Sequence, residues 1–150
     1  MQHYEAGPDR SSALADPRTL VSNPSRSTHA YSLEDVLAML EVMREPAKTI
    51  IATAAFPGLR KSELRGLPWE DLRENELSVS RSVWNAHIEE RTKTAASKVP
   101  IPLVPILQEW LAARRNGFST DGFIFAGPKM GRPLNLANLA RRVIVPKLKE

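Results

Sequence analysis

Residues 54–72 read AAFPGLRKSELRGLPWEDL, and the predicted fold depends on the chain breaks in this stretch. A run of small apolar residues ends at Pro57-Gly58, a pair that terminates helices and makes turns. Arg60 follows directly, and a short helix is predicted over residues 60–67, closing before the next proline. The stretch therefore places an arginine at the start of a helix that comes straight after a turn.

Two helices are predicted on the N-terminal side of this stretch. The first begins at Ser32, because Ser32 and Asp35 have the spacing of a capping box. Its residues repeat with helical spacing, which predicts one apolar face. That face consists of Val36, Leu37, Leu40 and Met43. The second helix covers residues 47–56, which are mostly apolar, and ends at the Pro-Gly turn.

The pattern changes from helical to strand spacing after residue 76. Leu77, Val79, Arg81 and Val83 alternate with three serines, and this alternation predicts a strand. Two more short strands are predicted over residues 88–91 and 98–102. The tryptophans on either side of the first strand, Trp69 and Trp84, are expected to pack in the core or against the sheet rather than to serve as platforms on which DNA bases stack.

Helices are predicted again in the C-terminal part. One covers residues 105–115, and the last begins at a cap on Asn135 and runs to about Val145, with Pro146 disturbing its end. The order is helices, then a small three-stranded antiparallel sheet, then helices. This order predicts an α+β fold that is mainly α, rather than an alternating βαβ fold.

Composition divides the chain into a tail and one domain. Residues 1–30 are rich in Ser, Pro, Asp and Arg and have little apolar periodicity, so a flexible tail or linker is expected. Residues 31–150 are long enough for one domain with its own core.

Several classes of protein are excluded by what the sequence lacks. The chain has no cysteine, which rules out disulfides, thiolate zinc sites and cysteine nucleophiles and fits the cytoplasm as its location. No apolar stretch approaches the ~20 residues of a membrane span, and no apolar signal core is present. The three histidines lie far apart in the sequence, and neither a P-loop nor a G-x-S-x-G motif occurs. We therefore expect no metal and no cofactor.

Positive charge is concentrated toward the C-terminus. The net charge is +4, and residues 76–150 hold twelve basic and six acidic groups. A basic half is typical of proteins that bind a polyanion such as DNA. The alternative is a solvated surface with a surplus of lysine and arginine.

The motifs in residues 54–72 resemble the catalytic domain of the tyrosine recombinases, also called phage-type integrases. The family pattern of Gly-Leu-Arg, a Glu three residues on, and Leu-x-Trp-x-Asp is matched by Gly58, Leu59, Arg60, Glu63, Leu67, Trp69 and Asp71. Downstream, RTKTAASKVPIPL is similar to the strand hairpin of the family, and FIFAGPKMGRPL is similar to the segment before its second half. The resemblance covers roughly residues 23–148. Pro57 departs from it, since the family often has threonine there.

The resemblance implies a reaction and a partner. Tyrosine recombinases cleave and rejoin double-stranded DNA through a 3′-phosphotyrosyl link, in assemblies with other recombinase protomers and without a metal or nucleotide cofactor. By resemblance, Arg60 binds oxygens of the scissile phosphate, a task that suits the fork of a guanidinium. Lys93 would donate a proton to the leaving 5′-oxygen, and Glu63 would support the site. Further candidate DNA contacts are Arg91, Lys98, Arg141 and Arg142.

Each of these residues also has an ordinary structural interpretation. An arginine three residues before a glutamate on a helix is usually a surface pair. A lysine in a hairpin turn is common because turns are exposed to water. Arg141-Arg142 fits a solvated helix face. Only the combined order and spacing of the motifs favours catalytic roles for Arg60 and Lys93.

The remaining catalytic residues of the family are not found in the sequence. In the family a His-x-x-Arg pair and the tyrosine nucleophile lie C-terminal to the hairpin, but here no histidine follows His87 and the only tyrosines are Tyr4 and Tyr31. We therefore expect a catalytic domain truncated before these motifs and unable to cut DNA alone. The alternatives are a non-catalytic DNA- or partner-binding module and an unrelated α+β protein. An exposed apolar patch is expected on the last helix, at Leu139, Val143 and Leu148.

Overall fold

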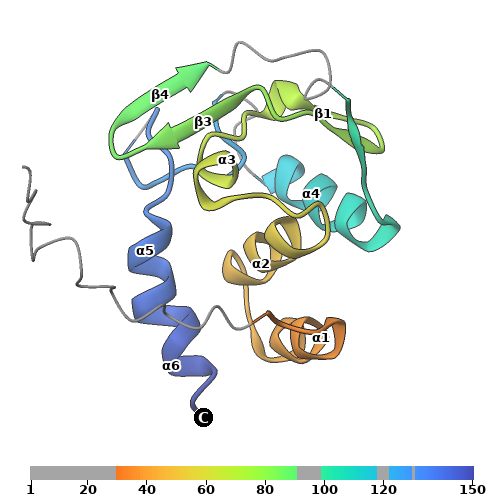
Figure 1. The fold of residues 1–150 in the computed structure, drawn as a ribbon, viewed down its shortest axis with the longest axis vertical. Helices are drawn as coiled ribbons and strands as arrows, with labels where there is room; N and C mark the ends of the chain where they lie inside the picture. The colour runs from red at the N-terminus through yellow and green to blue at the C-terminus, as the bar shows by residue number, and fades with distance from the viewer. Residues whose placement is uncertain (1–29, 91–98, 118–121, 130) are drawn as a thin grey trace, which may run out of the picture. The chain divides into compact units, whose positions relative to one another are not determined.

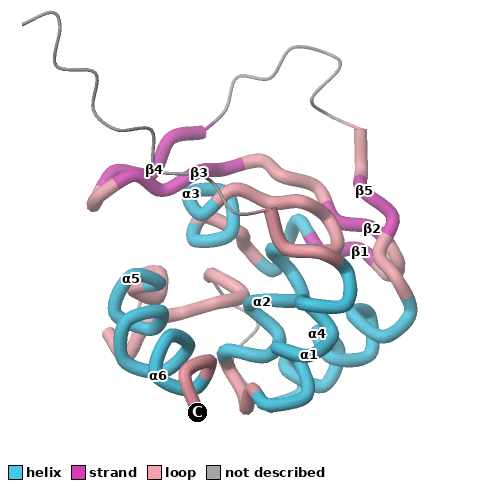
Figure 2. The backbone as a smooth tube through the Cα atoms, turned by 60° about the horizontal axis from the view of Figure 1, so that its bottom comes forward, coloured by secondary structure: helices cyan, strands magenta, loops and turns pink. Residues whose placement is uncertain are grey.

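A computed structural model describes residues 30–90, 99–117, 122–129 and 131–150. The expected tail lies outside the described residues, apart from Ala30. Within the unit Tyr31–Glu150, the strands lie on one side of the helices (Figures 1 and 2). The unit is α+β and mainly helical, with antiparallel pairing of its strands, as the sequence predicts.

The first two helices form where they are predicted. α1 covers Leu33–Val42 and α2 covers Ala47–Ala55. The capping box is present, because the Asp35 N–H donates to Ser32 Oγ at 3.1 Å and the Asp35 carboxylate accepts from the Ser32 N–H at 2.8 Å. The predicted apolar face of α1 is buried only in part: Leu40 and Met43 are buried, whereas Leu37 is 47% exposed.

The Pro-Gly pair ends α2 by a left-handed turn. Gly58 has φ of +73°, a value that glycine adopts without the clash that a Cβ atom introduces. The Leu59 N–H then donates to the Ala54 carbonyl at 3.1 Å, the long closing bond of a Schellman-type cap. α3 (Lys61–Arg65) starts two residues later. The predicted turn before Arg60 is confirmed.

The strands of the described residues form two sheets, which corrects the prediction of a single three-stranded sheet. β1 (Leu72–Arg73), β2 (Glu76–Leu77) and β5 (Ile101–Pro102) make one antiparallel sheet in the order β1-β2-β5. β3 (Arg81–Trp84) and β4 (His87–Glu90) make a separate antiparallel hairpin.

The strand predicted over residues 77–83 is divided because Asp71 binds its middle. The Asp71 carboxylate accepts hydrogen bonds from the N–H and the hydroxyl of Ser80, and its carbonyl accepts from the Ser78 N–H. Leu77 therefore pairs with Ile101 of β5, whereas the chain after Ser80 pairs with β4. A side-chain contact between residues nine positions apart overrides the alternation of the sequence here.

The two C-terminal helical regions also form. α4 covers Pro105–Gly117. The last region is divided into α5 (Leu136–Leu139), the π-helical turn η4 (Ala140–Ile144) and α6 (Val145–Lys147). Asn135 caps it as predicted, since its side chain accepts from the Asn138 N–H at 3.1 Å.

Pro146 widens the last helix instead of ending it. In η4 the Val145 N–H donates to the Ala140 carbonyl, five residues back, rather than to the carbonyl four residues back. Proline has no N–H and its ring crowds the carbonyl four residues earlier, so the helix passes Pro146 in the wider π geometry.

α2 lies in the middle of the helices and packs against α1, α3 and α4 (Figure 1). The core beneath the strands contains Leu67, Leu77, Leu107 and Phe125, all almost fully buried. A buried segment, Phe123–Phe125, joins this core, with the Ile124 N–H donating to the Leu67 carbonyl at 2.8 Å. In the described part of the chain, no helix combines the length and apolar character needed to cross a membrane.

The two tryptophans that were expected to pack in the core or against the sheet have different environments. Trp69 is 3% exposed and belongs to the core, as predicted. Trp84 is 68% exposed, so the prediction is wrong for this residue. Trp84 ends β3 directly before the turn at Asn85-Ala86, where no other described element covers that side chain.

Candidate functional site

Arg60 occupies the position just before the first residue of α3. Its backbone N–H donates to the Glu63 carboxylate at 2.9 Å, and its side chain is exposed. Glu63 itself is buried, with 8% of its surface exposed. The two residues therefore have separate tasks: Glu63 fixes the backbone at the start of α3, and the Arg60 guanidinium faces solvent.

Arg60 lines a surface cavity of about 360 Å³, which we call the Arg60 cleft. Its walls are the start of α3 and the tip of the β3–β4 hairpin, elements that pack directly on each other. The side chains that line the cleft include Arg60, Lys61, Ser62, Arg65, Trp84 and Asn85.

Arg65 ties the two walls of the cleft together. Its Nη2 donates to the Asn85 carbonyl at 3.2 Å, and its Nη1 lies 3.5 Å from the Val83 carbonyl. The remaining nitrogen, Nε, is buried and has no hydrogen-bond partner among the described residues. Arg65 therefore holds the backbone on both sides of Trp84 to α3.

The charges of the cleft suit an anionic ligand. Arg60, Lys61 and Arg65 are cationic, and no carboxylate is among the described residues that line the cleft. Guanidinium and ammonium groups bind phosphate or carboxylate oxygens through charge-assisted hydrogen bonds. The three cationic side chains of the cleft are therefore suited to binding an anion.

The structure brings together only part of the predicted site. Arg60 and Glu63 are adjacent at the start of α3. Lys93, Arg91 and Lys98 lie outside the described residues, so their predicted roles stay predictions.

The other predicted basic residues lie on a different part of the fold. Arg141 and Arg142 are exposed on η4, and neither lines the Arg60 cleft. Arg141 donates to the Asn138 side chain at 3.3 Å, and Arg142 lines a groove with Arg44 at the end of α1.

Tyr31 does not fill the place of a nucleophile in the described structure. It precedes α1, is 61% exposed and does not line the Arg60 cleft. Tyr4 lies outside the described residues.

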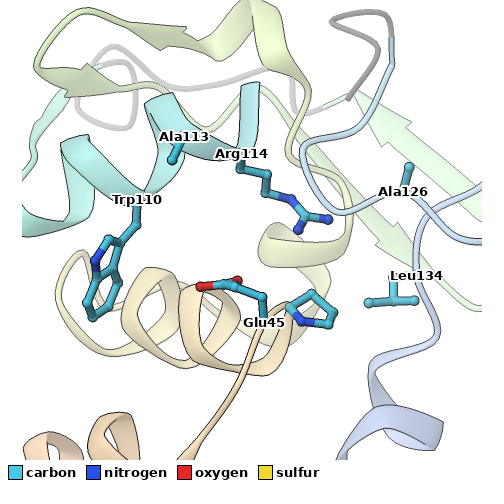
Figure 3. Close-up of a pocket in the computed structure, with 7 residues that line it drawn as sticks. Glu45, Trp110, Ala113, Arg114, Ala126 and Leu134 are labelled. Carbon is cyan, nitrogen blue, oxygen red and sulfur yellow. The ribbon is translucent and has the colours of Figure 1, made fainter. Parts of the chain in front are cut away.

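A second cavity, of about 490 Å³, lies between α4, the start of α2 and the loop after Phe125 (Figure 3). Trp110 and Arg114 project into it from α4, and Glu45 lies on the opposite wall. The Arg114 Nε donates to the Ile124 carbonyl at 2.8 Å, and its guanidinium lies 5.2 Å from the centre of the Phe125 ring. Through these contacts, Arg114 joins α4 to the buried segment Phe123–Phe125.

The electrostatics of Arg114 agree with this structural task. Burial lowers the pKa of its guanidinium, while the nearby Glu45 carboxylate acts in the opposite direction. Arginine titrates so far above neutral pH that it keeps its charge in spite of such a shift. The arginine in this cavity therefore has a carboxylate nearby, whereas no carboxylate is among the described residues that line the Arg60 cleft.

Of the charged and aromatic residues that line the cleft, the sequence predicts a site role for Arg60 only, and not for Lys61, Arg65 or Trp84. One signal could have indicated Trp84. It continues the serine positions of the alternation at residues 78–83, which places an aromatic side chain on the polar face of the predicted strand. Nothing in the sequence alone distinguishes Arg65 from an ordinary helical surface arginine.

Within the described residues, no group of three or more His, Cys, Asp or Glu side chains could hold a metal ion. Three comparisons, with protein-family models, with curated proteins and with solved structures, find no match to this chain.

Proposed function

We propose that this chain is a DNA-binding protein of the tyrosine recombinase type, with a partial recombinase catalytic fold, in which Arg60 binds a backbone phosphate of double-stranded DNA. The observation that carries the proposal is the position of Arg60. Its side chain is exposed beside two further cations, while its backbone is fixed by the buried Glu63. This arrangement agrees with the role that the resemblance assigns to Arg60.

The proposal also states that these 150 residues alone do not cleave DNA. They contain no histidine after His87 and no tyrosine after Tyr31, so no nucleophile follows Arg60 in the order that the family requires. Without a nucleophile the covalent route is closed. The chain alone therefore binds DNA without cutting it, and a suicide substrate leaves no covalent protein–DNA adduct.

A salt titration tests the binding function. The affinity for a DNA duplex should fall as salt rises, with a slope of roughly 0.9 in log–log form for each phosphate contact. Arg60→Ala should weaken binding about tenfold and make the slope shallower by about one contact, because a charge-assisted hydrogen bond is lost. Lys93→Ala should also weaken binding.

Arg73→Ala is the matched control, because Arg73 is exposed on β1 and does not line the Arg60 cleft. Equal losses for Arg60→Ala and Arg73→Ala would indicate general charge attraction and would contradict a phosphate site at Arg60. A covalent adduct with the suicide substrate would contradict the inactive state.

A second candidate function is a non-catalytic module that binds a protein partner. The exposed apolar side chains of the last helix region favour it, since Val143, Val145 and Leu148 are each more than 40% exposed. Retention of a protein partner by a chain with no measurable DNA affinity would favour this candidate.

A further inference from the structure

The side chain of Trp84 is unusual in being large, apolar in most of its surface and exposed next to three cations. Its exposed fraction is 68%, and it lines the Arg60 cleft with Arg60, Lys61 and Arg65. A tryptophan at such a position contributes nothing to the core, where Trp69 and Phe125 are buried. Exposed aromatic side chains beside cationic groups are a recurrent means of binding nucleic acid.

The backbone of Trp84 is held in place although its side chain is exposed. The guanidinium of Arg65 reaches the carbonyls on both sides of it, Val83 and Asn85. Val83 is buried and pairs with Ile88 across the hairpin. Because the backbone is already ordered, little backbone conformational entropy is lost when a ligand packs on the indole ring.

We propose that the Arg60 cleft binds an unpaired nucleotide of a DNA strand, with its base stacked on Trp84 and its phosphate held by Arg60 and Lys61. The inference rests on the proposed function, because it assumes that the cleft faces DNA. A cavity of about 360 Å³ lies within the range of small-ligand sites, near its lower end. The adjacent cations complement a single phosphate.

The geometry of stacking determines whether the bound base can be paired in a duplex or must be unpaired. In an intact duplex both faces of every internal base are covered by neighbouring bases, so a protein ring has no free face to contact. A gap or a single strand exposes base faces, and stacking on tryptophan then requires no particular sequence. The preferred substrate is therefore DNA with unpaired nucleotides.

The test compares three fluorescently labelled DNAs of equal length: an intact duplex, a duplex with a short single-stranded gap, and an oligo(dT) strand. Trp84→Ala should weaken binding to the gapped duplex and to oligo(dT) by about 5- to 150-fold, the range for loss of one stacked base. The affinity of Trp84→Ala for the intact duplex should stay within about twofold of that of the unchanged chain. Trp84→Phe should restore most of the loss, because phenylalanine keeps an aromatic face.

Ile88→Ala is the matched control, since Ile88 is 52% exposed on the same hairpin but does not line the cleft. It should not change binding to any of the three DNAs. Quenching of tryptophan emission by oligo(dT) gives a second readout and should be lost in Trp84→Phe. Circular dichroism of each variant tests whether the substitution leaves the fold intact.

The outcomes separate this inference from the proposed function. If Trp84→Ala binds gapped DNA and oligo(dT) as tightly as the unchanged chain, or weakens all three DNAs equally, the unpaired-nucleotide site is refuted while duplex binding through Arg60 stands. If oligo(dT) binds through Trp84 but no duplex binds, the inference is supported and duplex recognition is refuted. Absence of binding to all three DNAs refutes both.

Discussion

At the scale of single residues, Glu63 determines how Arg60 is presented. Its carboxylate is buried and accepts the Arg60 N–H at 2.9 Å, a donor that has no partner within a helix because it lies at the helix start. Glu63→Ala should lower the free energy of unfolding by about 1–3 kcal/mol, because a hydrogen bond to a charged group is lost. Glu63→Gln should cost less, since the amide oxygen can still accept. Urea denaturation measures both.

The control for this prediction is Glu109→Ala, which removes an exposed carboxylate from α4. Its free energy of unfolding should stay within about 0.5 kcal/mol of the unchanged chain. If Glu63→Ala behaves like Glu109→Ala, the carboxylate does not stabilise the start of α3, and the separation of tasks between Glu63 and Arg60 is wrong.

At the scale of elements, Gly66 sets the distance between α3 and β3. A Cβ atom at this position would lie 3.0 Å from the Arg81 carbonyl oxygen and 3.0 Å from the Ser82 Cα, and both are backbone atoms that cannot turn away. Gly66→Ala should therefore push α3 from the hairpin and destabilise the fold by about 1–3 kcal/mol. Thermal and urea unfolding followed by circular dichroism measure this loss.

Gly117 provides a closely matched control, because it also ends a helix and a Cβ atom added there would meet no other described residue within 4 Å. Gly117→Ala should be neutral or slightly stabilising, since alanine loses less backbone entropy. Similar losses in the two variants would contradict the steric explanation. A shift of α3 should also weaken DNA binding, because the two walls of the Arg60 cleft would separate.

The helices were predictable from the sequence because their signals are local. The Ser32 cap, the Gly58 turn and the Asn135 cap each depend on residues within one or two turns of chain, and each is confirmed. The division of the sheet was not predictable, because it depends on Asp71 binding Ser80 across nine residues. Periodicity describes only which side of a strand a residue occupies, not whether the strand is interrupted.

Of the residues that line the candidate site, only Arg60 was predicted from the sequence, and the surrounding residues of α3 and the β3–β4 hairpin were not. Arg60 and Glu63 stand out through their order in a motif, which the sequence carries directly. The contact between Arg65 and the hairpin joins residues eighteen to twenty positions apart, and it exists only after α3 has packed on β3. The exposure of Trp84 follows from the same packing, so neither could be derived from local pattern.

At the scale of the whole described unit, the last helix region should promote self-association. No side chain of η4 or α6 is buried among the described residues. The patch expected from the sequence is present in part: Val143 is 45% and Leu148 is 42% exposed, whereas Leu139 is partly buried against the core. Val143 also lines a groove of about 660 Å³ with Val42 of α1, which is 46% exposed. Charged side chains such as Arg142, Lys147 and Glu150 also line this groove, and its exposed apolar side chains favour association.

We expect light scattering coupled to size-exclusion chromatography to show a mass that rises with protein concentration. Val143→Glu should shift the population toward the monomer, because a charge is then placed where apolar surface would be buried. Val104→Glu is the matched control, since Val104 is 41% exposed but lies between β5 and α4, away from the groove. A monomer at every concentration would refute the prediction. An equal effect of both variants would show that added negative charge, rather than loss of the patch, disperses the protein.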